Sequence, residues 1–559
     1  MYPSLESEQF AQAVSQLATG LDDLGGYLKA NGIARGGPLP AGGPPGLAAT
    51  LAGYLERMNA LLRLYRTLGN YVYAFFSTGA YDARARRKTS EMEALEVRLK
   101  RQEVLFRGWV GTAAEQPELF QAALARPGPV REHAFYLKEA AQQSHYLMSM
   151  AEETLAAELS PSGGLAWEKL QAIVAAQINV PFEREGHLEQ VPMSILQNLR
   201  TDPDGEVRRR AYEAELAAWH SLREPLAACL NGVKGQVNTL DRRRGRTDCL
   251  HRPLDQARID RQTLDAMLGA VVDSFPAFRR YLHHKASLLG KEVLPWWDLF
   301  APTGRSGPRT TFAQAQELLL GQFGLFSERL LSMGRRAFDR HWIDAEPRDG
   351  KQGGAFCIPI PSVEEARVLC NFDGSFNQVS ALAHELGHAY HADCQAGKTQ
   401  LQRDIPMTLA ETASILVETM VTQAVLAQAT GAQERLAILE HSLIRATQLV
   451  VDIYSRYLFE KELFERRAQA EVPAEELCDM MLRAQRATYG DGLDPHHLHA
   501  YMWAWKSHYY RPDRSFYNFP YTFGLLFGLG LYAIYSCMPA AILGTTVGRR
   551  LTPPAPGSV

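Results

Sequence analysis

The spacing of apolar residues is the feature that most constrains this fold, because along most of the chain they recur every three or four positions. Residues at that spacing share one face of an α-helix, whereas the alternation typical of strands is scarce. The sequence therefore predicts a mainly α-helical protein. One such row contains Trp219, Leu222, Leu226, Leu230, Val233, Val237 and Leu240.

Three segments rich in Gly, Pro, Ser or Asp interrupt the helical pattern, at Gly36–Gly46, Ser160–Gly164 and Thr201–Gly205. In the last of them Asp202 or Asp204 is suited to cap a following helix. The 559 residues are enough for a sizeable core and more than one folding unit. We expect an N-terminal helical domain over residues 1–200 and a second domain over residues 201–559.

Two short β-prone stretches are the exception to the helical pattern. Gly353–Ile358 and Arg367–Phe372 are bounded by Gly and Pro, which indicates a small sheet. The sheet would immediately precede a helix predicted over Asn377–Asp393, which carries the most informative motif of the chain.

That motif is His384-Glu-Leu-Gly-His388, an H-E-x-x-H pattern. At 100° per residue the two histidines lie about 40° apart, one turn apart on one helix face, so both imidazoles can bind one metal ion. The opposite face is apolar, which leaves a polar stripe of His384, His388 and His391. The alternative interpretation is an ordinary solvated helix face.

A catalytic zinc site needs a third protein ligand. Glu411 lies on a second predicted helix, Pro406–Glu418, whose back is formed by Leu409 and other apolar residues. If the two helices pack antiparallel, Glu411 reaches the histidines. Glu418 shares its stripe and is expected to orient a ligand or stay outside the ligand set. His391 is the rival third ligand, although one straight helix cannot easily place three histidines around one ion.

Charge and cysteine content narrow the function classes. Lys and Arg number 59 against 62 Asp and Glu, which gives no field for nucleic acid. Seven scattered cysteines and an acidic N-terminus without a leader pattern favour a reduced, cytoplasmic protein. Residues 515–548 carry no charge, but their prolines, tyrosines and Asn518 favour a buried core helix over a membrane span. No particular oligomeric state is indicated.

Five motifs in one order resemble the oligoendopeptidase F branch of the thimet oligopeptidase family of zinc peptidases. The resemblance is good over about residues 200–535 and implies a large helical metallopeptidase of the zincin type, split by a deep substrate channel with a small sheet beside the active-site helix. The motifs are Pro295–Pro302, Gly350–Phe356, Asn371–Gly374, His384–His391 and Ala410–Ser414.

The same resemblance implies a zinc-dependent oligoendopeptidase that cleaves short unfolded peptides. One Zn²⁺ per chain would be bound by His384, His388 and Glu411, with Glu385 as the catalytic base. Three downstream residues match those that hold the reacting carbonyl in the family, and two more lie at a strand edge that could align a peptide. They are His508, Tyr517 and Tyr521, and Gly354 and Ala355 respectively.

The chain departs from the family pattern from about residue 536, where an apolar and Pro-rich tail replaces a charged amphipathic one. We expect a truncation or a shifted reading frame there. Three alternatives remain open: a helical binding protein with a vestigial site, a membrane-embedded peptidase, and an aminopeptidase. The last is disfavoured because no acidic G-x-M-E-N-type motif precedes His384.

Overall fold

The structure is a computed structural model that describes residues 1–537 except 80, 185, 304–308 and 349. It is mainly helical with small sheets, as the apolar spacing predicts. The expected atypical tail lies outside the described residues almost entirely. The domain boundary expected near residue 200 stays a prediction.

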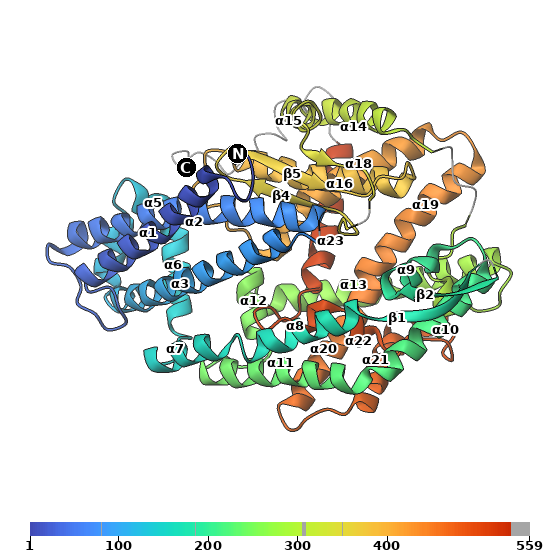
Figure 1. Ribbon diagram of the computed structural model, residues 1–559, viewed down its shortest axis with the longest axis horizontal. Coiled ribbons are helices and arrows are strands. Elements are labelled where there is room, and N and C mark those ends of the chain that lie inside the picture. The colour runs from blue at the N-terminus through green and yellow to red at the C-terminus, as the bar shows by residue number, and fades with distance from the viewer. Residues whose placement is uncertain (80, 185, 304–308, 349, 538–559) are drawn as a thin grey trace.

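The helices of the first 144 residues share a core of leucines and aromatic rings, and the two helices that follow them contribute no residue to it (Figure 1). Ser7 caps the first helix by accepting from the Phe10 amide, and two prolines open the second, where a missing N–H costs nothing. The helices are α1 (Glu8–Ala30), α2 (Gly43–Thr78), α3 (Ala83–Ala114), α4 (Pro117–Leu124), α5 (Pro129–Glu132), α6 (Ala134–Ser144), α7 (Met150–Leu159) and α8 (Gly164–Ala176).

A hairpin and a second set of helices follow. Asp204 caps α10 through the Glu206 amide, as expected, and the apolar row that begins at Trp219 spans two helices separated at Leu222. The elements are β1 (Asn179–Arg184), β2 (His187–Pro192), α9 (Met193–Asn198), η1 (Leu199–Thr201), α10 (Gly205–Ser221), α11 (Arg223–Arg243), α12 (His251–Ala257), α13 (Arg261–Leu288), η2 (Trp296–Asp298), α14 (Phe312–Phe326) and α15 (Glu328–Asp339).

The predicted small sheet is present, in the order β3-β5-β4. The strands are β3 (Ile343–Asp344), β4 (Phe356–Ile360) and β5 (Glu365–Leu369). Strand β4 pairs antiparallel with β5, Phe356 opposite Leu369, and forms an edge. The buried Lys351 amine donates to the Asp344 carboxylate at 2.9 Å and to the Cys370 carbonyl at 2.6 Å, which ties the sheet together.

The remaining helices surround this sheet and the chain's largest core. They include a π-helical turn, η3, a form that often marks functional sites. The elements are α16 (Phe376–Cys394), α17 (Met407–Ala410), α18 (Thr412–Gln428), α19 (Ala432–Thr447), η3 (Gln448–Asp452), α20 (Ile453–Arg467), α21 (Ala474–Tyr489), η4 (Gly490–Gly492), α22 (Met502–Trp505), η5 (Ser507–Tyr510) and α23 (Phe519–Ser536).

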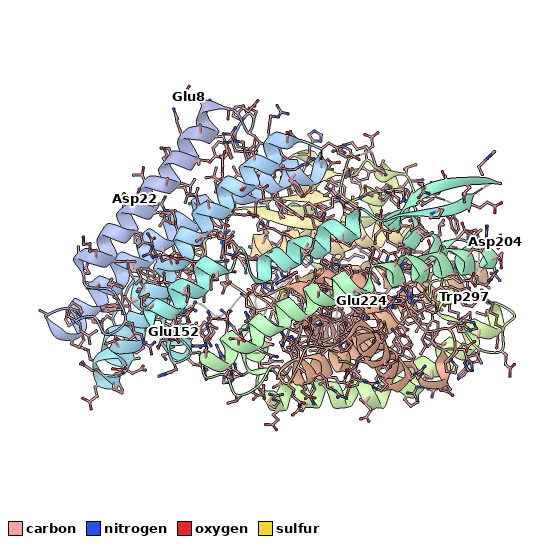
Figure 2. The ribbon with its side chains drawn as sticks, turned by 60° about the horizontal axis from the view of Figure 1, so that its bottom comes forward. Glu8, Asp22, Glu152, Asp204, Glu224 and Trp297 are labelled. Atoms are coloured by element: carbon pink, nitrogen blue, oxygen red, sulfur yellow. The ribbon has the colours of Figure 1, made fainter. Side chains whose placement is uncertain are left out.

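Helix α23 joins two groups of elements, one around the small sheet and one around α11 and α20. In Figure 1, α16 and α18 lie with β4 and β5 above, α11 and α20 lie below, and α23 runs between the two groups. Side chains of α23 pack in both cores: Leu525 in the lower one, Tyr532 and Tyr535 against the upper one. Figure 2 shows Glu8 and Asp22 along α1 toward one end, with Asp204 near the other.

The predicted apolar back of α16 is confirmed, since its six side chains are all buried: Val379, Leu382, Ala383, Leu386, Ala389 and Tyr390. The prediction for Leu409 is wrong. This side chain is 38 % exposed, because α17 ends before the face continues into α18.

Two helical segments, Met407–Gln428 and Phe519–Ser536, are long and apolar enough to cross a membrane by length and composition alone. Core helices of other proteins pass the same test, so this is weak evidence for a span. All seven cysteines are free thiols.

Candidate metal centre

Helix α16 positions the H-E-x-x-H residues. Its first turn is capped by Ser375, whose hydroxyl accepts from the Gln378 amide. Helix α18 crosses it antiparallel, because Ser380 meets Glu418 while His388, two turns later, meets Glu411. The two backbones come so close that a Cβ on Gly387 would lie 2.5 Å from the Ser414 Cα. The glycine inside the motif is therefore required by packing.

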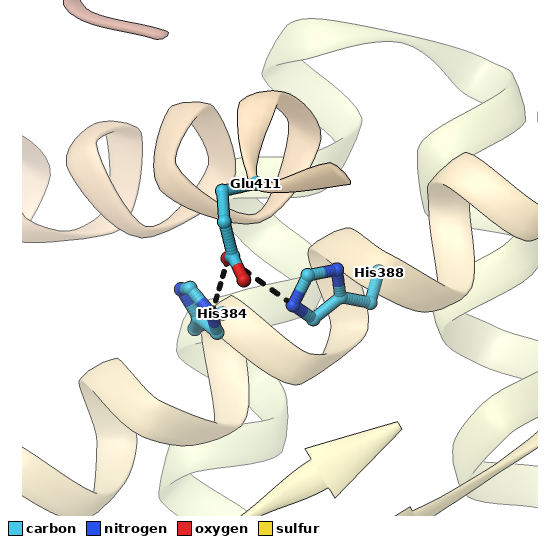
Figure 3. A group of neighbouring side chains, drawn as sticks. All are labelled: His384, His388 and Glu411. Carbon is cyan, nitrogen blue, oxygen red and sulfur yellow. Dashed lines mark ion pairs between the residues drawn. The ribbon is translucent and has the colours of Figure 1, made fainter. Parts of the chain in front are cut away.

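Three side chains converge at this crossing (Figure 3). The Nε2 atom of His384 lies 3.2 Å from the Glu411 carboxylate, and that of His388 lies 3.4 Å from the same oxygen. The three ligand atoms lie within 4.8 Å of one another. Two imidazole nitrogens and one carboxylate oxygen are a ligand set typical of a catalytic zinc ion, whose fourth position is taken by water or substrate.

Glu411 does not lie inside a continuous helix, as the sequence had indicated, but at the junction of α17 and α18. The break turns its carboxylate toward α16. The hydroxyl of Ser414, in the first turn of α18, donates to this carboxylate at 2.9 Å. Gly524 of α23 leaves room for it, since a Cβ there would lie 2.7 Å from the Glu411 Cβ.

Glu418 lies behind His384. It accepts from the Nδ1–H of His384 at 3.0 Å and from the Ser380 hydroxyl at 2.9 Å, and Arg445 lies 2.6 Å away. A carboxylate that accepts the Nδ1 proton leaves the Nε2 lone pair for a metal. Glu418 therefore takes the orienting position that the sequence allowed for it.

The charges at the centre favour a cation between the three groups. Burial lowers the pKa of His384, but its hydrogen bonds to Glu411 and Glu418 outweigh burial and raise it to about 9. Burial opposes ionisation of Glu411, yet the two imidazoles hold its pKa well below the ordinary range. Both shifts express the same preference for positive charge beside an ionised carboxylate.

Glu385 is buried next to His384 and faces the sheet that carries Cys357. Burial raises its pKa, with the neighbouring histidines acting against the shift. A raised carboxyl pKa suits a group that accepts a proton near neutral pH and returns it.

The other candidates from the sequence lie around this centre. His391 is not one of the three converging ligands, and burial followed by the charge of His388 lowers its pKa. The carbonyl of Gly354, at φ 82°, accepts from the Asn371 amide at 3.0 Å, and Ala355 packs against the core beneath β4. A role of Gly354 and Ala355 toward substrate stays a prediction.

Tyr521, Tyr517 and His508 form a row leading away from Glu411. Burial first, then Tyr517 and Glu411, raise the pKa of Tyr521 far above its usual value, so its hydroxyl keeps its proton. The ring centroids of Tyr517 and Tyr521 are 5.9 Å apart, and those of Tyr517 and His508 are 4.5 Å apart. Pro520, which made a helix doubtful, instead lies in the first turn of α23.

Asn518 fixes the orientation of His508. Its Oδ1 atom lies 3.2 Å from the His508 Nδ1 and 3.5 Å from the Arg456 guanidinium, which presents only donors to it. Neutral His508 thus donates through Nδ1 and keeps a lone pair on Nε2. Burial first, and Arg456 among nearby cations, lower its pKa to about 4. For His508 to donate a hydrogen bond to the reacting carbonyl, as the resemblance implies, the ring would need the other tautomer or a second proton.

A cavity of about 570 Å³ lies beyond Tyr517, between α3 of the N-terminal helices and the first turns of α17 and α23. Its wall includes Tyr517 and Pro520, but none of the three metal-site residues. Whether this cavity belongs to the expected substrate channel stays a prediction; its link to the metal centre is Tyr517, whose ring neighbours that of Tyr521.

Several residues at the centre were not predicted from the sequence: Ser380, Ser414, Arg445 and Asn518. Ser380 lies one turn before His384, and Ser414 lies one turn after Glu411. This spacing could have marked both serines as neighbours of the centre. Arg445 reaches Glu418 from α19, and no local pattern marks such a contact.

Comparisons with known proteins agree over much of the chain. The profile of peptidase family M3 matches residues 198–550, and a profile described as Oligopeptidase F matches residues 116–179. Group B oligopeptidase PepB of Streptococcus agalactiae is 26 % identical over 73 % of this chain and 69 % of its own length. The chromosomal oligoendopeptidase F of Lactococcus lactis is 24 % identical over 62 % of this chain and 58 % of its own length.

A solved structure shows the same fold. The crystal structure of oligoendopeptidase F from Enterococcus faecium superposes with a TM-score of 0.66 over 96 % of this chain and 90 % of that one, at 16 % identity. Likeness at this identity concerns the fold alone.

Proposed function

Because this chain belongs to peptidase family M3, we propose that it is a zinc-dependent oligoendopeptidase that hydrolyses internal bonds of short, unfolded peptides. The observation that carries the proposal is the convergence of His384, His388 and Glu411 beside the buried Glu385. The relatives' names, an oligopeptidase and an oligoendopeptidase, support the size class of the substrate.

Each residue of the centre has a separate task. When bound by His384, His388 and Glu411, zinc supplies a Lewis acid that acidifies water and polarises the scissile carbonyl. Glu385 accepts the proton of the attacking water and passes it to the leaving amine. Glu418 holds the His384 ring in its tautomer from behind.

The row of tyrosines faces the reacting carbonyl. Tyr521, whose hydroxyl stays protonated, donates a hydrogen bond to the oxygen on which negative charge develops. Tyr517 lies next along the row and is placed to hold the neighbouring peptide unit. The edge strand β4 offers main-chain groups that pair with an extended peptide whatever its side chains. Broad sequence tolerance follows from such pairing.

The free thiols fit a reducing compartment, so we place the protein in the cytoplasm with short peptides as its partners. We assign no role to nucleic acid or to a membrane. One zinc ion per chain follows from the single group of three ligands found among the described residues.

The test is cleavage of an internally quenched peptide of about ten residues that is blocked at both ends. An extended peptide rises about 3.3 Å per residue, so this length is enough to span the centre. We expect cleavage that a chelator stops and zinc restores, and that Glu385→Gln lowers by several orders of magnitude. Cleavage of peptides with free N-termini only would indicate an aminopeptidase instead. A folded, zinc-loaded protein that cleaves neither would contradict the proposal.

A further inference from the structure

Arg445 reaches the metal centre from α19, a helix that carries none of the three converging ligands. Its Nη2 atom lies 2.6 Å from the Oε2 atom of Glu418 and 3.1 Å from the Nδ1 atom of His384. Apart from His384, Arg445 is the one cationic residue within 4.0 Å of Glu418 in the part of the chain that the structure describes. One guanidinium therefore joins α19 to both helices of the centre, α16 and α18.

Three donors converge on the buried Glu418 carboxylate. Ser380 donates to Oε1 at 2.9 Å, whereas His384 and Arg445 both donate to Oε2. The terminal torsion of a glutamate is broad, so hydrogen bonds from neutral donors hold its rotation weakly. A hydrogen bond from a charged donor is about twice as strong, and a guanidinium is always charged in proteins. Arg445 is thus the contact best suited to fix which oxygen of Glu418 faces His384.

The helix that carries Arg445 is anchored on two of its faces. Toward the centre, the Nε2 atom of His441, one turn before Arg445, lies 3.3 Å from the Ser380 Oγ. On another face, Glu440 pairs with Lys285 of α13 at 2.5 Å, and both of these side chains are buried. The backbone that presents the guanidinium to the carboxylate is therefore held by packing on either side of it.

The formal charges of the centre give an orienting role of Arg445 a measurable sign. When ionised, Glu385, Glu411 and Glu418 bring three negative charges against the one positive charge of Arg445, and a divalent cation makes the sum zero. Coulomb's law alone predicts that removing Arg445 strengthens the binding of a cation, because a like charge is lost. An orienting role predicts the opposite, since the partner that directs the His384 ring then loses its own support.

We propose that Arg445 is a positioning residue of the metal centre. It holds the Glu418 carboxylate at the angle at which Oε2 accepts the Nδ1 proton of His384, so that Nε2 keeps its lone pair for zinc. Its contact with His384 is on the Nδ1 side of the ring, so it acts through Glu418 and not on the metal. This inference rests on the proposed peptidase function, because zinc gives the orientation its use.

The zinc affinity of Arg445→Gln, measured by competition with a chromogenic chelator, tests the proposal without turnover. We expect Kd to rise about tenfold, the lower end of the usual effect of losing an outer partner of a ligand. An unchanged or lower Kd would overturn the proposal, because the loss of charge alone lowers it. Arg435→Gln is the matched control, since Arg435 is exposed on the same helix and donates to a backbone carbonyl. Its Kd should equal that of the parent protein.

Two further variants test the route through Glu418. Arg445→Lys keeps a charged donor for Oε2, so its Kd should return to within about threefold of the parent value. A Lys variant as weak as the Gln variant would contradict the assignment. In the Glu418→Gln background, Arg445→Gln should weaken zinc binding no further, because the contact through which it acts is already lost. A further loss of affinity in this double variant would overturn the proposal.

Thermal unfolding in excess chelator compares the variants without zinc and so separates damage to the fold from loss of the metal. Peptide cleavage is scored independently of Kd. A tenfold weaker zinc affinity in Arg445→Gln supports the positioning role even if the parent protein cleaves no peptide. An unchanged Kd beside a parent protein that does cleave would overturn this inference alone and leave the proposed function intact.

Discussion

A single carboxylate, Glu418, accepts the Nδ1 proton of His384 and so fixes how this ring faces the proposed zinc site. Replacing it by Gln keeps a hydrogen-bond acceptor but removes the charge that holds the Nδ1 proton and pairs with Arg445. We expect zinc affinity to fall by about 10–100-fold, the usual effect of losing such a partner. Competition with a chromogenic chelator measures it.

The control for that variant is Glu465→Gln, a change at an exposed glutamate of α20 that should leave zinc affinity unaltered. Equal affinity in Glu418→Gln and the parent protein would contradict an orienting role of the Glu418 charge.

Asn518 is expected to set the tautomer of His508. With ¹⁵N-labelled histidine, the His508 ring should show a protonated Nδ1 and a free Nε2 at neutral pH, and Asn518→Leu should mix the two tautomers. Asn179→Leu, a change at an exposed position, is the control. A ring protonated on Nε2 in the parent protein would contradict this prediction.

The ionisation of His508 gives a second, pH-dependent expectation. Its pKa is about 4, below the ordinary 6.5, so the ring stays neutral as the pH falls from 7 until near 4. Stability that depends on the neutral ring is fully present above pH 6.5 and is lost between pH 6.5 and 4. In Asn518→Asp a new carboxylate should raise the midpoint, which the same ¹⁵N shifts report.

The convergence of His384, His388 and Glu411, with Glu418 behind them, could be predicted from helical spacing, because His384 and His388 lie one turn apart and Glu411 and Glu418 share one stripe of the sequence that follows. Asn518 could not, because its role depends on Arg456, which approaches from a different helix. Spacing predicts which side chains share a face, but not what meets that face from elsewhere.

At the level of elements, the crossing of α16 and α18 depends on Gly387. Adding a methyl group would force Cβ to within 2.5 Å of the Ser414 Cα, so the helices must separate. We expect Gly387→Ala to lower the free energy of unfolding by about 1–3 kcal/mol and to weaken zinc binding, because Glu411 moves with α18. Urea unfolding and chelator competition measure the two effects.

Gly321→Ala is the matched control for that change. Gly321 lies within α14 with open space around its Cα, so alanine should stabilise the helix by about 0.5–1 kcal/mol. If both variants gained stability, the close approach of α16 and α18 would not constrain position 387.

The bounds of elements were predictable where one apolar face continues, and not where it breaks. The helix expected over Asn377–Asp393 is observed as Phe376–Cys394. The helix expected through Glu411 is divided there, because the chain turns to direct that carboxylate at α16. Regular periodicity gives no sign of such a turn.

Across the whole molecule, buried ion pairs join helices that are distant in sequence. Lys234 of α11 and Glu460 of α20 lie 2.6 Å apart and are fully buried. Lys234→Met should cost about 3–5 kcal/mol, because it leaves Glu460 charged without a partner. The double variant Lys234→Met/Glu460→Met should recover most of that loss in urea unfolding. Equal losses in the single and double variants would contradict this account.

The class of fold and the small sheet were predictable from local pattern, since each depends on neighbouring residues. The charged cavity was not, because α2, α3, α17 and α23 contribute its wall from positions as far apart as Arg66 and Pro520. The atypical tail from residue 536 stays a prediction about residues that lie beyond those described.

The position of α23 has a consequence for the order of events during synthesis. The three proposed zinc ligands lie within 28 residues of chain, on two helices that pack directly, so they can meet as soon as α18 has left the ribosome. Tyr517, Tyr521 and the cavity wall beside them are made about a hundred residues later. A growing chain would thus bring the proposed zinc ligands together while still lacking Tyr517 and Tyr521, the groups proposed to engage a peptide.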